Sequence, residues 1–341
     1  MKPQFLPLFL LVPFTLFATD FQGAKVVSYF GYDDSIELKN DHCRVVITPS
    51  FGGKVMHYSR NGENILMVDE SEEGWLYNPE QGNRTFNSGG RFDLGPQGIF
   101  PNIRLHTVGQ WKGYVIDDRK ALLVSQTDPA TGLQLYREFT LAKDSSRLRI
   151  YETMINNGDQ TLEFNYWCRT FAKGHGIVIV PLSKPSFYTR GYAFMSPEGL
   201  IYHKPVRDPH VWEKDGYVII DEEPKLKKMG FDSNIGWMAY LMQSNDLFVK
   251  EYPVFTDRPY IDLASGTASV YYSNNFHGHE LVELEPMGPK EVLNPGERGF
   301  FWEEWSLLEY PFPEDPKTLQ PSAVYEHIKS SGLRIIEPTI D

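Results

Sequence analysis

The chain has 341 residues, a formal net charge of −12 at neutral pH and an aromatic content of 14%. A surface this acidic repels phosphate backbones and anionic lipid headgroups, so nucleic-acid and membrane-surface partners are disfavoured. Two cysteines, Cys43 and Cys168, are too few for a scaffold built on disulfide bonds; one bridge and two separately buried thiols both remain open.

The N-terminus has the pattern of a secretory signal. Met1 and Lys2 precede the apolar stretch PQFLPLFLLVPFTLFA, and the small residue Ala18 comes shortly before the first acid, Asp20. The stretch is shorter than the about 20 apolar residues that cross a bilayer. We expect residues 1–18 to be a signal peptide and the protein to be secreted or periplasmic, without a membrane anchor after cleavage. A buried N-terminal strand or a retained anchor is the alternative.

Short runs of alternating polar and apolar residues extend from about residue 35 to residue 310. Examples are LQLYREFTLA, RLRIYETMIN and LEFNYWCRTF, which are separated by turn residues. Such runs predict antiparallel strands in two packed sheets, because each run has one apolar side to bury. We expect one all-β domain over residues 19–312. The segment PSAVYEHIKSSG predicts a short helix, closed by Gly332, in a C-terminal tail over residues 313–341.

Four stretches, in this order, resemble the galactose mutarotase-like superfamily. They are LKNDHCRVVITPSFGGKVMHYSRNGENIL (38–66), FNSGGRFDLGP (86–96), INNGDQTLEFNYWCRTFAKGHGIVIVPL (155–182) and ELVELEPMGPKEVLNPGERGFFWEEWSLLEY (280–310). The resemblance is closest to secreted bacterial members without an assigned activity. It implies a large antiparallel β-supersandwich and a carbohydrate ligand, either a mono- or an oligosaccharide.

The chain departs from the aldose 1-epimerases of that superfamily in two motifs. Those enzymes carry an N-x-x-H-G-G segment and an H-P-Y-F segment, and neither occurs here. Three functions therefore stay open: a mutarotase-like isomerase, a polysaccharide lyase or hydrolase, and a non-catalytic glycan-binding protein. The fold alone does not decide among them.

Two glutamates are the strongest catalytic candidates. Glu283 and Glu285 are two residues apart, so a strand places both carboxylates on one face, where their repulsion raises the pKa of one of them. Such a pair suits acid–base catalysis. The resemblance implies that a glutamate at this position, with Glu285 preferred, removes the proton of the anomeric hydroxyl. We expect His175 to protonate the ring oxygen. The alternative is that the two glutamates are solvated surface acids and that His175 is a loop histidine without a catalytic role.

Other residue types suit sugar binding. Arg91 follows two glycines that permit close approach of a ligand, and arginine can contact paired hydroxyls or a uronate carboxylate. Aromatic rings stack on the apolar faces of pyranose rings. The substrate-binding candidates are Arg91, Arg169, Lys250, His106, Trp75 and Trp212. No phosphate-binding or dinucleotide fingerprint is present, so we expect no cofactor. We also expect no metal site and a monomeric protein.

Overall fold

The structure, a computed structural model, describes residues 20–81, 87–95, 104–204, 206–260 and 266–338. The expected signal peptide, residues 1–18, lies outside these ranges. Within them the chain forms two large antiparallel sheets, two α-helices and three short 3-10 helices. The all-β prediction with a short C-terminal helix is confirmed. No helix among the described residues is long and apolar enough to span a bilayer.

Sheet A contains 11 strands within the described ranges. Their order across the sheet is β1 (Ala24–Tyr29), β2 (Tyr32–Lys39), β3 (Arg44–Thr48), β4 (Lys54–Ser59), β5 (Gly90–Gly95), β10 (Leu162–Lys173), β20 (His279–Leu293), β19 (Ala268–Phe276), β16 (Lys228–Phe231), β12 (Tyr192–Met195) and β13 (Ile201–Tyr202). Strands from distant parts of the chain therefore meet at the centre of this sheet, where β10 lies between β5 and β20.

Sheet B contains 10 strands by the same count. Their order is β14 (Val211–Lys214), β15 (Tyr217–Ile220), β11 (Ile177–Pro181), β17 (Trp237–Leu241), β18 (Asp246–Glu251), β21 (Arg298–Glu309), β9 (Leu148–Asn156), β8 (Leu133–Leu141), β7 (Lys120–Val124) and β6 (Lys112–Asp117). The helices are α1 (Arg104–Thr107), α2 (Pro321–Ser330), η1 (Glu70–Glu72), η2 (Pro79–Gln81) and η3 (Pro316–Thr318).

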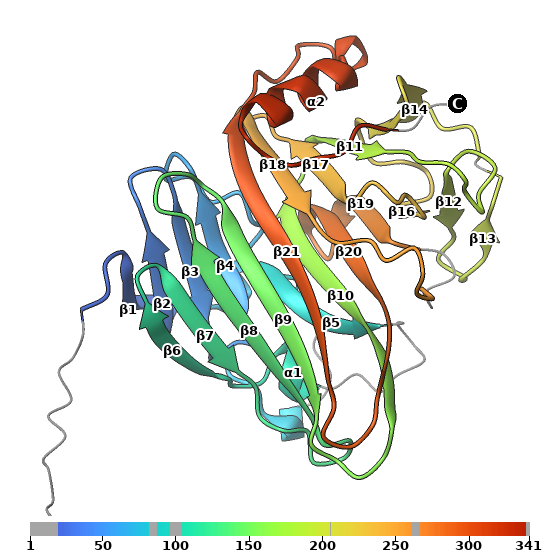
Figure 1. The fold of residues 1–341 in the computed structure, drawn as a ribbon. Helices are drawn as coiled ribbons and strands as arrows, with labels where there is room; N and C mark the ends of the chain where they lie inside the picture. The colour runs from blue at the N-terminus through green and yellow to red at the C-terminus, as the bar shows by residue number, and fades with distance from the viewer. Residues whose placement is uncertain (1–19, 82–86, 96–103, 205, 261–265, 339–341) are drawn as a thin grey trace, which may run out of the picture.

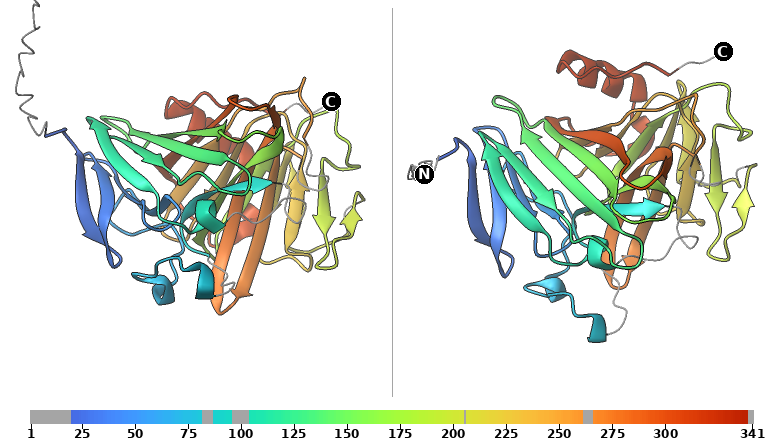
Figure 2. Two further views of the ribbon diagram at one scale, coloured as in Figure 1. Left: turned by 90° about the horizontal axis from the view of Figure 1, so that it is seen from below. Right: turned by 60° about the horizontal axis from the view of Figure 1, so that its bottom comes forward.

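The two halves of the chain lie on opposite sides of the molecule. Figure 1 shows β1 to β9 on one side and β11 to β19 on the other, with the long strands β10 and β21 running between them. Figure 2 shows the two sheets from two further directions, with α2 outside one of them. Both sheets take strands from each half of the chain.

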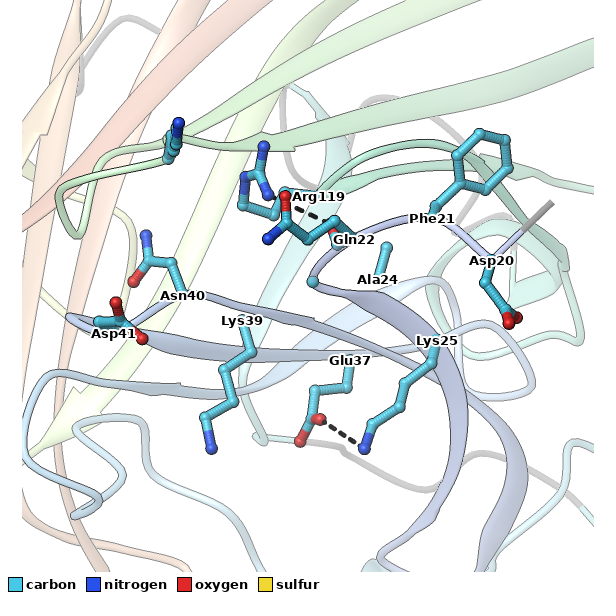
Figure 3. Close-up of a pocket in the computed structure, with 12 residues that line it drawn as sticks. Asp20, Phe21, Gln22, Ala24, Lys25, Glu37, Lys39, Asn40, Asp41 and Arg119 are labelled. Carbon is cyan, nitrogen blue, oxygen red and sulfur yellow. Dashed lines mark hydrogen bonds and ion pairs between the residues drawn. The ribbon is translucent and has the colours of Figure 1, made fainter.

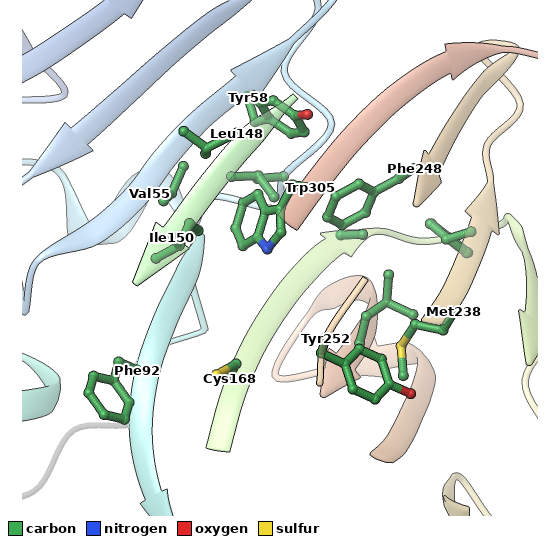
Figure 4. Packing of buried hydrophobic residues seen from close by; sticks show 14 of the residues in the cluster. Val55, Tyr58, Phe92, Leu148, Ile150, Cys168, Met238, Phe248, Tyr252 and Trp305 are labelled. Atoms are coloured by element: carbon green, nitrogen blue, oxygen red, sulfur yellow. The ribbon is translucent and has the colours of Figure 1, made fainter. Parts of the chain in front are cut away.

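The main hydrophobic core fills the space between the sheets. Trp305 of β21 is fully buried there and contacts Tyr58 and Phe248, with ring centres 5.6 and 5.4 Å away (Figure 4). A Cβ atom on Gly90 would lie 2.2 Å from the Trp305 ring. Gly90 therefore accommodates a tryptophan from the opposite sheet, and not the close approach of a ligand that the sequence suggested.

Helix α2 covers part of the outer face of sheet B. Val324, Tyr325 and Ile328 are buried against this face, and the Tyr325 ring stacks on Trp237 with 6.4 Å between centres. Pro321 at the start and Gly332 after the end, with a φ of 85°, match the signals that delimit a helix. The predicted C-terminal helix is thus anchored by its apolar side.

Candidate functional site

The candidate site lies on the outer face of sheet A, around the middle of β10. Side chains alternate along this strand: the Cys168 thiol points inward and donates a hydrogen bond to Glu152 of sheet B, whereas Arg169 points outward. Arg169 pairs with Arg91 on β5, and Phe171 pairs with Glu283 on β20. The register therefore brings two predicted binding residues next to the predicted catalytic strand.

Arg169 links the two glutamates. Its Nη2 lies 2.7 Å from Glu283 Oε2, and its Nε lies 3.3 Å from Glu285 Oε1. Lys228 of β16 forms an ion pair with Glu285, and the Ser269 hydroxyl donates a hydrogen bond to the same carboxylate. Both glutamates are buried. Glu285 is thus surrounded by cations and donors, whereas the contacts of Glu283 are fewer.

This asymmetry separates the two carboxyl groups in acidity. Burial, only partly offset by Arg169, raises the pKa of Glu283 to about 7, and the neighbouring Glu285 adds to the rise. Burial also acts to raise the pKa of Glu285, but Lys228, the hydrogen bond from Glu283 and Arg169 outweigh it, so this pKa lies well below its usual range. Below about pH 7 the pair therefore shares one proton, held between Glu283 and Glu285.

A third carboxylate, Asp93, contacts both arginines. Asp93 Oδ2 lies 2.8 Å from Arg91 Nε and 3.3 Å from Arg169 Nη1. On the far side of Arg91, the pairing of Val55 with Gly90 places Lys54 of β4 in the same row. The Lys54 ammonium lies 3.4 Å from the centre of the Phe51 ring, and burial lowers its pKa to about 7.

Several buried polar atoms near the arginines lack a hydrogen-bond partner among the described residues. They are Trp167 Nε1, Asp93 Oδ1 and Asn165 Oδ1. Trp167 and Asp93 occupy directly paired positions on β10 and β5. An unpaired buried donor or acceptor costs about 1–3 kcal/mol, so such atoms mark a place that a polar ligand can stabilise. Hydroxyl groups, which both donate and accept, suit this set.

Lys250, predicted to contact substrate, lies on β18 of sheet B and points toward the inner face of sheet A. It is fully buried between the sheets and forms an ion pair of 2.9 Å with Glu303. Its ammonium also donates hydrogen bonds to the carbonyls of Cys168 and Leu284 and to the Thr170 hydroxyl. These are backbone neighbours of Arg169, Glu283 and Glu285. Lys250 thus holds strands β10 and β20 in place from the inner face of sheet A.

The inter-sheet network also contains Arg137, Glu152 and Cys168. Arg137 Nη2 lies 3.1 Å from Glu152 Oε1, and Arg137 Nη1 donates to the carbonyl of Gly53. The ligand atoms of Glu152, Cys168 and Glu303 are close enough to hold an ion. Arg137 and Lys250 already neutralise these acids, so the group does not suit a further cation. Cys43 and Cys168 are two free, buried thiols, which decides between the two open alternatives.

His175 does not lie beside the glutamates. It follows the end of β10 in a turn, with a φ of 62°, and its Nε2 is 2.8 Å from Glu280 Oε2. By strand rise it lies on the order of 20 Å from Arg169. It borders a separate hollow of about 580 Å³ whose lining includes Lys173 and His279.

The remaining predicted residues are distributed over the molecule. Trp75 contacts Phe51, with 6.0 Å between ring centres, and so borders the Lys54 end of the site. His106 is buried in α1, and burial lowers its pKa to about 4. Trp212 lies on β14 at the edge of sheet B, where its Nε1 donates to Asp221 at 2.6 Å. Neither His106 nor Trp212 contacts the paired glutamates.

A further hollow of about 580 Å³ lies beside β1 and β2 (Figure 3). Lys25 pairs with Glu37 at 3.3 Å there, and Arg119 donates to the backbone of Gln22. These contacts join the N-terminal strands to the loop before β7. No paired carboxylates with separated acidities line this hollow, so the outer face of sheet A remains the candidate site.

Four residues of the site were not predicted from the sequence: Asp93, Lys228, Ser269 and Lys54. Asp93 had a usable signal, because it is two residues from Arg91 on one strand and so shares its face. Lys228 and Ser269 had none. They reach Glu285 only through the pairing of β16 with β19 and of β19 with β20.

Solved structures with the same architecture are known. A galactose mutarotase-like protein from Lactobacillus casei aligns with a TM-score of 0.52 and 10% identity, over 80% of this chain and 100% of that chain. A galactose mutarotase-like protein from Clostridium acetobutylicum aligns with a TM-score of 0.52 and 11% identity, over 84% and 98%. This chain has the galactose mutarotase-like fold.

A candidate aldose 1-epimerase from Escherichia coli shares the galactose mutarotase-like fold as well, with a TM-score of 0.54 and 13% identity over 80% of this chain and 98% of that chain. No family model and no curated protein matches the sequence. At these identities the likeness establishes the fold, and the chemistry has to be argued from this chain's own residues.

Proposed function

We propose that the protein binds a sugar on the outer face of sheet A and interconverts its anomers by acid–base catalysis. The observation that carries the proposal is the glutamate pair with separated acidities. Burial raises the pKa of Glu283 to about 7, whereas the cations around Glu285 keep it ionised. One group can therefore donate a proton while the other accepts one.

Ring opening needs both actions. Glu283 gives its proton to the ring oxygen, Glu285 accepts the proton of the anomeric hydroxyl, and the bond between the anomeric carbon and the ring oxygen breaks to leave an aldehyde. Rotation about the next bond and the reverse transfers close the ring with either configuration. The reverse transfers also return a proton to Glu283 and leave Glu285 ionised, so the pair is restored after each turnover. No cofactor is consumed in these steps.

The unpaired polar atoms support a hydroxyl-rich ligand. Trp167 Nε1 and Asp93 Oδ1 are buried within the same row of β5 and β10 and lack partners among the described residues. Sugar hydroxyls can form hydrogen bonds with both atoms. Part of the free energy gained from these hydrogen bonds can orient the sugar ring over the glutamates.

Exchange NMR on a panel of aldoses tests the proposal. Wild-type protein should accelerate anomer exchange of at least one sugar, and Glu283→Gln and Glu285→Gln should each abolish most of the acceleration. Glu280→Gln is the matched control, because Glu280 lies on the same strand but is exposed and pairs with His175. An exchange rate equal to that in buffer for every sugar would contradict the proposal, and binding without exchange would indicate a glycan-binding protein.

Export to the periplasm or the cell exterior is part of the proposal. It is supported by the sequence of residues 1–18, with a basic start, an apolar stretch and a small residue before the first acid. N-terminal sequencing of the protein recovered from cell fractions tests it: a mature chain that begins near residue 19 is expected, and an intact N-terminus in the cytoplasm contradicts it.

A further inference from the structure

Like charges face one another across the outer face of sheet A. Lys54, Arg91 and Arg169 lie in one row on the adjacent strands β4, β5 and β10, and Lys228 approaches from the other side of β20. Like charges directly opposite on neighbouring strands destabilise a sheet. A single carboxylate oxygen, Asp93 Oδ2, lies between the two arginines and contacts both.

The accessible part of this cluster is cationic. The side chains of Arg91, Arg169 and Lys228 are 12, 15 and 18% exposed. The carboxylates that balance them are more deeply buried: Asp93 is 9%, Glu283 3% and Glu285 0% exposed. A ligand that arrives from solvent therefore meets guanidinium and ammonium groups before it meets the acids.

This local surface contrasts with the chain as a whole, whose net charge is −12. An acidic protein does not attract anions in general. The three partly exposed cations Arg91, Arg169 and Lys228 therefore favour a ligand with a negative charge at this point of the sheet. Arginine is well suited to the task, because its planar fork matches a carboxylate or a phosphate with two parallel hydrogen bonds.

We propose that the sugar bound at this site carries an anionic group, a carboxylate or a phosphate, that is recognised by Arg91 and Arg169. The neutral hydroxyls of the same sugar then face Trp167 Nε1 and Asp93 Oδ1. This inference rests on the proposed function in one respect, that the ligand is a sugar, and it does not depend on catalysis.

Binding of methyl glycosides tests the inference separately from the proposed reaction, because a methyl glycoside cannot open its ring. The panel is methyl galactoside, methyl galacturonoside and a methyl galactoside 6-phosphate, each titrated by calorimetry. At least one of the two acidic ligands should bind tenfold or more tightly than the neutral one, and added salt should reduce that preference. The acidic ligand with the greater affinity identifies the anionic group. Equal affinities for all three ligands would overturn the inference.

Arginine variants locate the contact. Arg91→Gln should remove the preference for the acidic ligand while affinity for the neutral ligand changes less than threefold, and Arg91→Lys should retain part of it. Arg298→Gln, an exposed arginine at the start of β21, is the control and should bind as wild type does. A loss of equal size for acidic and neutral ligands in a folded Arg91→Gln would overturn the assignment, and the wild-type panel decides the inference even if that variant does not fold.

The two proposals fail in distinguishable ways. Tight binding of an acidic glycoside, with no acceleration of anomer exchange for the matching free sugar, removes the mutarotase proposal and retains the anionic ligand. Acceleration of anomer exchange for neutral sugars, with no preference for acidic glycosides, removes the anionic ligand and retains the mutarotase proposal. Formation of an unsaturated, ultraviolet-absorbing product from a polyuronate would replace anomer exchange by a lyase reaction and would still retain the anionic ligand.

Discussion

Charged clusters lie on both sides of strand β10, and the two clusters differ in access to solvent. The outer cluster contains Arg169, Glu283 and Glu285, and Arg169 is 15% exposed. The inner cluster contains Lys250 and Glu303, which are 0 and 1% exposed and lie between the sheets. Each cluster combines basic and acidic groups, so composition alone does not separate them.

The pKa values of the carboxyl groups do not distinguish the inner cluster from the outer cluster either. Burial raises the pKa of Glu152 in the inner cluster to about 7, the same value that burial gives Glu283 in the outer one. The inner cations Lys250 and Arg137, however, donate to backbone carbonyls of β10, β20 and β5, which are strands of the site. We conclude that the inner cluster positions the site. Only the outer cluster reaches the surface, through the partly exposed side chains of Arg91, Arg169 and Lys228. A shifted pKa indicates function only where a ligand can reach the group.

The largest expected effect is a loss of stability when the inner cluster is changed. Lys250→Met should lower the free energy of unfolding by about 3–5 kcal/mol, because it leaves the Glu303 carboxylate buried without its cation. Urea denaturation measures the change. Lys228→Met is the matched control on the outer side, where the lysine is 18% exposed, and should cost less than half as much. Equal losses in the two variants would remove the distinction between the faces.

The second effect belongs to the outer side and is catalytic. Glu283→Gln should lower the rate of catalysed anomer exchange about 100-fold, within the usual range for removal of a general acid. At pH 6 the free energy of unfolding should change by less than about 1 kcal/mol, because the pKa of Glu283, raised to about 7, already makes the buried group largely neutral there. Exchange NMR and urea denaturation on the same preparation measure both. A large loss of stability would assign Glu283 a structural role.

The catalysed rate should also depend on pH with a definite sign. The reaction requires the shared proton, so the rate should be highest below about pH 7 and should fall as Glu283 loses its proton above that value. Glu285, with its pKa lowered by Lys228 and Arg169, stays ionised through the acid side of this range. Exchange rates measured from pH 5 to 9 check the profile. A rate that rises through pH 7 would make ionised Glu283 a simple base.

Stability should respond to pH through the inner cluster. The pKa of Glu152 rises from 4.5 to about 7 on burial, so between these values the folded protein binds more protons than the unfolded chain. Glu152 should therefore lower the free energy of unfolding by on the order of 2 kcal/mol between about pH 5 and pH 7. Glu283 and His106 titrate in the same range, so this contribution is the difference between wild type and Glu152→Gln. Denaturation at pH 5, 6 and 7 measures the slope. Glu152→Gln should reduce it, and an unchanged slope would assign the pH dependence to other groups.

The smallest effect concerns His175. His175→Ala should leave anomer exchange within twofold of wild type and stability within about 0.5 kcal/mol, because the histidine is exposed and its pair with Glu280 lies at the surface. Exchange NMR and thermal unfolding measure the two quantities. A loss of exchange comparable with that of Glu283→Gln would restore His175 as the acid and would mean that the turn moves toward the glutamates when a sugar binds.

Local patterns in the sequence were sufficient for the fold class and for part of the site. Alternation along LQLYREFTLA predicts a strand, and β8 spans Leu133–Leu141 with every second residue buried. The spacing of Glu283 and Glu285 predicts a shared face, because side chains on a strand repeat every two residues. These inferences succeed since they depend only on neighbours along the chain.

The partners of those glutamates depended on tertiary structure. Lys250 points inward and Arg169 points outward, although both lie on strands rich in buried residues. The sequence of such a strand does not show which face is inner, because a shift of one residue in register reverses the face of every side chain. Lys228 and Ser269 reach Glu285 through strands that pair only in the folded sheet. The sequence by itself determined which residues form strands and that two acids share one face. Only the pairing of distant strands decided which cations surround them, because register is set by packing of the whole core and not by any local segment.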